Sequence, residues 1–292
     1  MIQSRKPAIL NFDSAVCNIP EPINVPLQAW QERIRFGCRW STFRQLEPLI
    51  SAALTEQYGC VFTGSGDYHH LSYLLLQHLA LQEEIQLVIC DNHPDNMRYP
   101  FGIHCGSWVY WATRLPQIRH VHVIGIGSSD ISASHAWENH LGPLVKRKLT
   151  YWSTGVDARW LRWLNASHAN RAFPDADSLM FEFLQTMDKT LPVYLSIDKD
   201  VLRPTVVKTN WDQGIFEEKH LQDMITACQG RIIGADITGE ASVYQYKNRF
   251  KRWLSAADGQ QTPSEMEIAR WQHQQNALNL RLLERINDGW RN

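Results

Sequence analysis

The chain has 292 residues, 44% of them hydrophobic, so it is long enough to bury a large core. Its 29 basic and 30 acidic residues leave a formal charge of −1, so no excess charge indicates nucleic acid or an anionic membrane as a partner. We expect no membrane span, because apolar runs of about 18 residues are absent, and no signal peptide. The six cysteines form no CxxC pair, which favours reduced thiols and a cytoplasmic location.

Short runs rich in Val and Ile alternate along the chain with stretches of helical spacing. We predict strands at 60–62, 87–90, 121–125, 193–197 and 231–235, and helices at 71–81, 178–187 and 217–228. A polar break at 255–264 precedes an amphipathic helix at about 264–288, which is expected to pack on the domain, with a subunit contact in a homo-oligomer as the alternative. The alternation predicts one α/β domain over 1–292, a three-layer α/β/α sandwich with a mostly parallel sheet.

Polar clusters follow three of the predicted strands. The first is Gly64–His70, in which a glycine-rich turn leads into the histidine pair His69 and His70 at the start of a helix. A lone histidine is more often a core or surface residue than a ligand, and the spacing leaves the choice within this pair open. In open parallel sheets ligands gather at the carboxyl ends of the strands, so the three clusters are expected to converge.

The second cluster is Asp91-Asn92-His93-Pro94-Asp95, directly after the predicted strand 87–90. Asp91, His93 and Asp95 alternate, so in an extended backbone they point the same way. A polar turn would explain Asn92 and Pro94 but not this alternation. Two carboxylates with an imidazole suit Mn²⁺, Zn²⁺ or Fe²⁺ better than Ca²⁺ or Mg²⁺, which predicts metal ligands here.

The third cluster is Ser196-Ile197-Asp198-Lys199-Asp200, at the end of the predicted strand 193–197. Asp198 and Asp200 are like charges at close range, and a divalent cation is the usual reason to tolerate them. Alone this pattern is weak, because aspartate pairs are common in solvated loops. The three clusters together offer more ligands than one ion can use, which predicts a two-metal site for hydrolysis.

The three clusters, in this order, resemble the arginase/agmatinase (ureohydrolase) superfamily. That family carries GGDH, D-A-H-x-D and S-x-D-x-D segments at successive strand ends, matched here across roughly residues 60–240 by 66–69, 91–95 and 196–200. The resemblance implies two divalent ions, Mn²⁺ first and Zn²⁺, Fe²⁺ or Ni²⁺ as alternatives. His69, Asp91, Asp95 and Asp198 would share one ion or bridge both, and His93 and Asp200 would complete the other. By the same resemblance, His104 in Ile103-His104-Cys105-Gly106 is the candidate general acid or base, with a structural loop histidine as the alternative.

The chain also departs from the family pattern. Arg203 stands where the family has aspartate, and the stretch 209–214 stands where the family is rich in Gly and Pro. The family's D-x-x-E near the last strand is Asp236…Glu240 here, offset by one residue. Glu240 is the candidate guanidinium contact, and Asp212 is a further carboxylate that would suit a cationic substrate. These differences identify a divergent relative.

The resemblance implies hydrolysis of a linear C–N bond in a small cationic guanidino compound, giving urea and an amine. A metal-bridging hydroxide would attack the planar carbon and His104 would help to protonate the leaving amine. Three alternatives remain: a deacetylase-like amide hydrolase, a two-metal phosphoesterase using Lys199 and Arg203 for phosphate, and a non-catalytic protein that keeps the fold.

Overall fold

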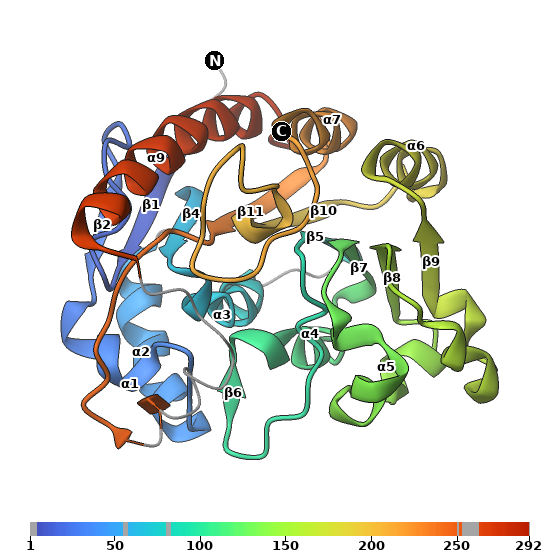
Figure 1. Cartoon of the computed structure of the whole chain (residues 1–292). Coiled ribbons are helices and arrows are strands. Elements are labelled where there is room, and N and C mark those ends of the chain that lie inside the picture. Colours follow the sequence, from blue (N-terminus) through green and yellow to red (C-terminus); the bar gives the residue numbers. More distant parts are fainter. Residues whose placement is uncertain (1–4, 55–57, 80–82, 250, 253–262, 292) are drawn as a thin grey trace.

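The computed structural model describes residues 5–54, 58–79, 83–249, 251–252 and 263–291. Within them, nine strands form one sheet in the order β2-β1-β4-β11-β10-β5-β7-β8-β9, and every pairing in it is parallel. Helices α6, α7 and α9 cover one face of this sheet, and α2, α3, α4 and α5 cover the other (Figure 1). The predicted three-layer α/β/α fold with a mostly parallel sheet is confirmed.

The strands are β1 Lys6–Asn11, β2 Ile23–Pro26, β3 Gly37–Cys38, β4 Tyr58–Gly64, β5 Ile85–Cys90, β6 Ile103–His104, β7 Ile118–Ile126, β8 Leu149–Thr154, β9 Asn170–Phe173, β10 Val193–Asp198 and β11 Ile232–Thr238. The helices are α1 Gln31–Ile34, α2 Trp40–Ala53, α3 Leu71–His78, α4 Trp108–Ala112, α5 Leu141–Val145, α6 Ala176–Thr186, α7 Glu218–Ala227 and α9 Glu265–Asn287. Strands β3 and β6 pair separately and antiparallel.

The five predicted strands correspond to β4, β5, β7, β10 and β11, which form the centre of the sheet, although the predicted strand 231–235 begins one residue before β11. The four predicted helices correspond to α3, α6, α7 and α9, apart from 80–81 and the polar break at 255–262, which lie outside the described residues. Strands β1, β2, β8 and β9 and helix α2 were not predicted. Their sequences mix polar and apolar residues, and α2 contains Pro48.

Alternate residues of the central strands serve the two layers of core. In β5, Leu87 and Ile89 pack with α2, α3 and α4, whereas Val88 and Cys90 pack with α6, α7 and α9. All four side chains are fully buried. Because both faces of the strand are covered, its segment 87–90 is a continuous apolar run without alternating polar residues.

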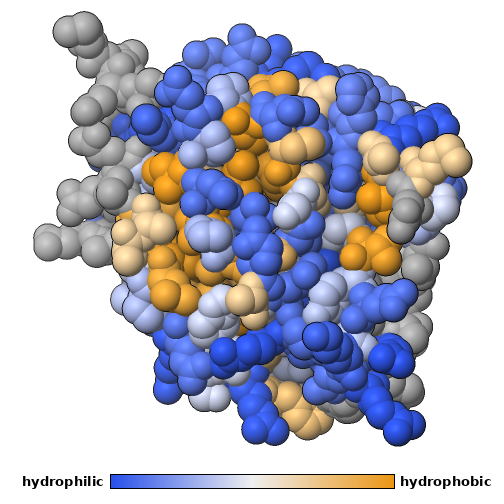
Figure 2. Space-filling view, turned by 90° about the vertical axis from the view of Figure 1, so that its left-hand side faces the viewer, coloured by the Kyte–Doolittle hydropathy of each residue, from blue (hydrophilic) through white to orange (hydrophobic). Residues whose placement is uncertain are grey.

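The edge of the sheet at β2 has one neighbouring strand, β1, and ends at Pro26, which cannot donate a hydrogen bond to a further strand. The face on this side of the molecule mixes apolar and hydrophilic side chains (Figure 2). Leu49 on α2 is exposed. No helix among the described residues is long and apolar enough to span a membrane.

Gly125 in β7 fills a position where only glycine fits. Its φ is +100°, and a Cβ there would overlap Val201 Cγ2 and lie 3.3 Å from the Phe216 ring. Both are core residues of the layer that supports the site. A side chain would therefore meet backbone strain and overpacking together.

We expect Gly125→Ala to reduce the free energy of unfolding by roughly 2–4 kcal/mol, the sum of these two effects. Gly230→Ala is the matched control, because Gly230 also has a positive φ, +71°, but nothing within 4 Å of its Cβ position. That change meets the backbone strain alone and is expected to cost about 1–2 kcal/mol. Urea denaturation of both variants measures the difference, and equal midpoints would contradict the packing argument.

Candidate metal centre

The carboxyl ends of β4, β10 and β5 bring the three polar clusters together, as the sequence predicted. These strands and β11 are neighbours in the sheet, so the residues that follow them meet at one edge. The six predicted ligands all line one cavity of about 460 Å³: His69, Asp91, His93, Asp95, Asp198 and Asp200. Two sets of three have ligand atoms close enough to hold an ion, namely His69, Asp91 and Asp198, and Asp91, His93 and Asp200.

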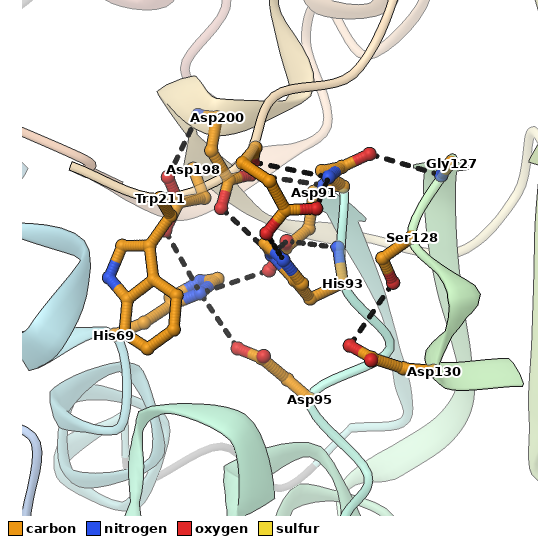
Figure 3. A network of polar contacts seen from close by, with 12 residues as sticks. His69, Asp91, His93, Asp95, Gly127, Ser128, Asp130, Asp198, Asp200 and Trp211 are labelled. Carbon is orange, nitrogen blue, oxygen red and sulfur yellow. Dashed lines mark hydrogen bonds and ion pairs between the residues drawn. The ribbon is translucent and has the colours of Figure 1, made fainter. Parts of the chain in front are cut away.

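Three carboxylates face the Nδ1 atom of His69. Its Nδ1 atom lies 2.9 Å from Asp95 Oδ2, 3.1 Å from Asp91 Oδ2 and 3.6 Å from Asp198 Oδ2 (Figure 3). His70, by contrast, is fully buried against Phe43 and does not line the cavity. The geometry thus selects His69 from the pair.

The turn that carries His69 is fixed by a buried ion pair. Arg35 Nε lies 2.6 Å from Asp67 Oδ2, and a second carboxylate, that of Asp13, lies 3.6 Å from the same guanidinium group. Gly64 is the last residue of β4 and has a φ of +91°. A Cβ at this position would lie 2.8 Å from the Oδ1 atom of Asp13. These contacts set the direction in which the chain leaves the strand towards His69.

The second nitrogen of His69 determines which tautomer the ring adopts. Ser196 Oγ donates its proton to Asp236 Oδ1 at 2.8 Å, so it accepts a hydrogen bond from His69 Nε2 at 3.0 Å. Asp236 is fully buried and also accepts hydrogen bonds from Ser72 and Tyr194. With its proton on Nε2, a neutral His69 presents the Nδ1 lone pair to the carboxylates, which is the arrangement of a metal ligand.

His93 forms the other half of the centre. Its Nδ1 atom lies 2.9 Å from Asp200 Oδ2 and 3.5 Å from Asp91 Oδ1. Its Nε2 atom lies 2.8 Å from Asp212 Oδ1, on the opposite side of the ring. Asp91 therefore offers one oxygen to each histidine and joins the two halves.

Three of the carboxylates are anchored by backbone N–H groups at the strand ends. Asp91 Oδ1 accepts a hydrogen bond from His93 N, Asp198 Oδ1 from Asp200 N, and Asp200 Oδ1 from Asn92 N, at 2.7–3.0 Å. In each case the other oxygen, Oδ2, faces a histidine. The ligand atoms are thus oriented by the backbone before any ion binds.

Burial and mutual repulsion perturb the acids of this cluster. Burial and the charge of Asp91 raise the pKa of Asp95 to about 7 and that of Asp198 to about 6. Burial raises the pKa of Asp200 well above its usual value, with repulsion from Asp198 and Asp91 adding to it. Burial opposes the ionised form of Asp91 too, but hydrogen bonds from His69 and His93 outweigh it and lower the Asp91 pKa.

The histidines respond in the opposite sense. Burial opposes their charge, but the carboxylates around them raise the pKa of both His69 and His93 well above the usual value. Buried carboxylates crowded around two imidazoles are a donor set that divalent cations satisfy, so the residues present fit two ions. The mixed oxygen and nitrogen ligands suit Mn²⁺, Fe²⁺ or Zn²⁺ better than Ca²⁺.

His104 lines the same cavity, at the end of the short strand β6. Its ring stacks on Phe36 with centroids 5.8 Å apart and meets Tyr99 edge-on at 4.3 Å. Its Nδ1 atom accepts a hydrogen bond from Gly106 N, so a neutral ring carries its proton on Nε2. Burial lowers the pKa of His104 to about 3, so the ring is neutral near pH 7.

Glu240 lies apart from the cavity, contrary to the prediction that it contacts substrate. It is 1% exposed, forms an ion pair with Lys199 Nζ and accepts a hydrogen bond from Asn279 on α9. Glu240 is not among the residues that line the cavity. Its carboxylate is neutralised inside the protein, and this placement removes the basis for a guanidinium contact.

Several cavity residues have no signal in the sequence that we recognised. Asp130, Trp211 and Phe36 are such residues, whereas Asp212, which also lines the cavity, was a carboxylate that the sequence offered for a cationic substrate. Asp130 follows β7 at the fourth strand end of the centre, and its Oδ2 atom accepts a hydrogen bond from Ser128 (Figure 3). Its position in the turn that follows the predicted strand 121–125, five residues after its end, was the clue, although no spacing pattern singled it out.

The comparisons with known proteins agree with this architecture. Residues 23–252 match the model of the arginase family. The chain belongs to the arginase family. An uncharacterised protein of Thermotoga maritima is 27% identical over 211 residues, covering 72% of this chain and 70% of that protein.

Two solved structures resemble this chain at low sequence identity. An arginase from Medicago truncatula has a TM-score of 0.53 and 15% identity, covering 87% of this chain and 84% of that one. A proclavaminate amidino hydrolase from Streptomyces clavuligerus has a TM-score of 0.49 and 17% identity, covering 85% of this chain and 70% of that one. The likeness to the Medicago truncatula arginase supports the arginase-like fold.

The buried pair of Lys199 and Glu240 yields a test of the corrected role. Glu240→Gln leaves an unpaired buried ammonium group and is expected to lower the free energy of unfolding by about 3–5 kcal/mol. The double variant Glu240→Leu/Lys199→Met replaces both charged partners by apolar side chains and should recover much of that loss. Glu182→Gln, in the exposed pair with Arg171, is the control and should cost less than about 1 kcal/mol. If Glu240→Gln left the free energy of unfolding unchanged and raised KM, Glu240 would be a substrate contact after all.

Metal binding is expected to depend on pH with a definite sign. The raised pKa values of His69 and His93 mean that both rings hold protons near neutral pH in the absence of metal, and an entering cation must displace them. The affinity for Mn²⁺ should therefore fall as the pH is lowered from about 8 to about 6, with proton release on binding. Calorimetry in buffers of different ionisation enthalpy measures that release.

The stoichiometry tests the centre itself. Metal analysis after reconstitution with Mn²⁺ is expected to give about two equivalents, and Asp200→Ala and Asp95→Ala are each expected to lose metal. At saturation the ions should raise the unfolding temperature, because they bind only the folded site. Fewer than about one equivalent in the wild-type protein would contradict a two-metal centre.

Proposed function

We propose that this arginase-family protein is a binuclear-metal hydrolase that cleaves a linear C–N bond of a guanidino compound, giving urea and an amine. The observation that carries the proposal is the pair of imidazole Nδ1 atoms, on His69 and His93, that face four carboxylates in one cavity. Family membership supports a hydrolase in general terms. When bound, two divalent cations at such a site supply a hydroxide nucleophile at neutral pH and polarise the group that it attacks.

His104 serves this reaction as a hydrogen-bond donor. Because its ring is neutral and Nδ1 already accepts from Gly106 N, the proton on Nε2 is free to be donated within the cavity. Phe36 and Tyr99 hold the plane of the ring on two sides. A ring that stays neutral can stabilise a leaving nitrogen through Nε2–H but carries no additional proton for it, which narrows the general-acid role expected from the sequence.

The cavity favours a cationic substrate that has no carboxylate of its own. None of the lining residues that the structure describes is lysine or arginine. Beyond the predicted ligands, the walls carry the carboxylates of Asp130 and Asp212 and the aromatic rings of Phe36, Tyr99 and Trp211. Carboxylates and aromatic faces attract an ammonium or guanidinium group, whereas a substrate carboxylate would find no cationic partner there.

The phosphoesterase alternative loses its support in this geometry. It depended on Lys199 and Arg203, yet Lys199 is fully buried in its ion pair with Glu240. Arg203 forms an exposed ion pair with Glu217 and does not line the cavity. Neither residue is placed to bind phosphate at the candidate centre.

The assay that tests the proposal is urea release from a panel of guanidino compounds by the Mn²⁺-reconstituted protein. A guanidino amine should be hydrolysed with a kcat/KM at least about tenfold above that of the matching guanidino acid, because of the cavity charges. Asp130→Asn should raise KM for the amine about tenfold, through the loss of one charge-assisted hydrogen bond of roughly 1.5–3 kcal/mol.

The control for Asp130→Asn is Asp157→Asn, an exposed aspartate paired with Arg159 outside the cavity, which should leave KM unchanged. Acetylated amines and phosphate esters complete the panel. Acetate release without urea would replace the proposal with a deacetylase-like amide hydrolase, and phosphate release alone would make it wrong. A preference for the guanidino acid would contradict only the proposal that the substrate has no carboxylate.

A further inference from the structure

His93 is held from both sides of its ring, and the outer contact comes from a residue far away in the sequence. Asp212 Oδ1 lies 2.8 Å from His93 Nε2. An ionised carboxylate only accepts hydrogen bonds, so Nε2 carries the proton. A neutral His93 then turns its Nδ1 lone pair towards Asp200 Oδ2, 2.9 Å away. The outer carboxylate thereby sets the tautomer that binds metal.

Asn92 fixes the position of Asp212 in turn. Its Nδ2 group donates to Asp212 Oδ2 at 3.1 Å and to the Asp212 carbonyl at 3.2 Å. Its Oδ1 atom accepts from Gly127 N at 3.1 Å, and its backbone N–H donates to Asp200 Oδ1 at 3.0 Å. One buried amide thus connects the ends of β5, β7 and β10 with the loop that carries Asp212.

Asn92 and Asp212 contact each other and act as one structural unit. An alanine at position 92 could not donate to the loop at 209–214, and a residue without a side-chain acceptor at position 212 would leave His93 Nε2 without this partner.

The two histidines differ in how deeply their outer partners are buried. His69 Nε2 is hydrogen-bonded to Ser196, which is in turn hydrogen-bonded to Asp236, and both partners are completely buried. His93 leans on Asp212, whose side chain is 66% exposed at the rim of the cavity. Solvent competes for the second contact but not for the first, so the His93 half of the centre is less firmly held.

We propose that Asp212 is a positioning residue that, locked by Asn92, holds His93 in its metal-binding orientation and thereby sets the affinity of the more weakly held ion. The proposal rests on the metal centre of the proposed function. It assigns to Asp212 no contact with the ion, because Asp212 lies on the far side of the ring from Asp200. Because the Asp212 side chain is exposed, its loss should weaken binding of the metal ion by about tenfold, the lower end of the effect of such outer partners.

The test is a calorimetric titration of the metal-free full-length protein with Mn²⁺, supported by the electron paramagnetic resonance spectrum of the bound ion. Asp212→Ala should weaken one of two binding events about tenfold and leave the other unchanged. Asp212→Asn keeps an acceptor oxygen for His93 and should recover part of the loss. Asn92→Ala should act in the same direction as Asp212→Ala.

The matched control is Asp130→Asn, which removes one negative charge from the same cavity without touching His93. If it weakens Mn²⁺ binding as much as Asp212→Ala does, charge rather than positioning is responsible and the inference is wrong. Loss of a full equivalent in Asp212→Ala, as expected for Asp200→Ala, would make Asp212 a ligand instead. Two tight ions in Asp212→Ala would refute the inference alone, whereas no metal in the wild-type protein would also refute the centre.

Discussion

The repulsion among the buried carboxylates is the constraint on which the rest of this structure depends. Asp91, Asp95, Asp198 and Asp200 are each at most 5% exposed, and they meet within one small region at the edge of the sheet. Isolated buried charges of one sign are strongly unfavourable. The fold holds them together through backbone N–H groups at the strand ends and through two imidazole rings. The same arrangement that is unfavourable without a cation makes the site selective for one.

Parallel pairing explains how such a site can be assembled with little local strain. Asp198 is the last residue of its strand and the other three carboxylates sit one to five residues beyond theirs, where the sheet itself supplies the direction of the chain. Because the strands are covered on both faces, their ends are rigid, and a carboxylate there moves little. Outer contacts then determine the orientation of the rings, buried for His69 and exposed for His93.

The sequence predicted what depends on local spacing. The D-x-H-x-D and S-x-D-x-D patterns marked the ends of two strands, and the apolar runs identified the five central strands. The extended backbone expected for these patterns is not present, because β5 ends at Cys90, Asp95 has φ +45° and Asp200 lies in a 3-10 turn at 199–201. The sequence did not predict β9, whose residues Asn170–Phe173 include polar side chains at the sheet edge. Nor could it predict Asp212 as a partner of His93, because that contact joins residues 119 positions apart through a loop without regular structure.

Glu240 shows how a local pattern can mislead. Strand β11 ends at Thr238, and Gly239 then adopts φ +89°, so the chain turns before Glu240. Glu240 N donates to Gly64 O, and its carboxylate points to Lys199 and Asn279. The one-residue offset from the family spacing coincides with this turn. Only the packing of α9 shows where the side chain of Glu240 lies.

The buried Lys199–Glu240 pair has a consequence for recognition. With Glu240 neutralised and Asp212 engaged by His93 and Asn92, the cavity carboxylate that remains beyond the predicted ligands is Asp130. It stands across the cavity from Trp211 (Figure 3). For the proposed reaction, selection of a cationic substrate rests on Asp130 and a set of aromatic rings, while the other acidic groups belong to the candidate metal centre or support it.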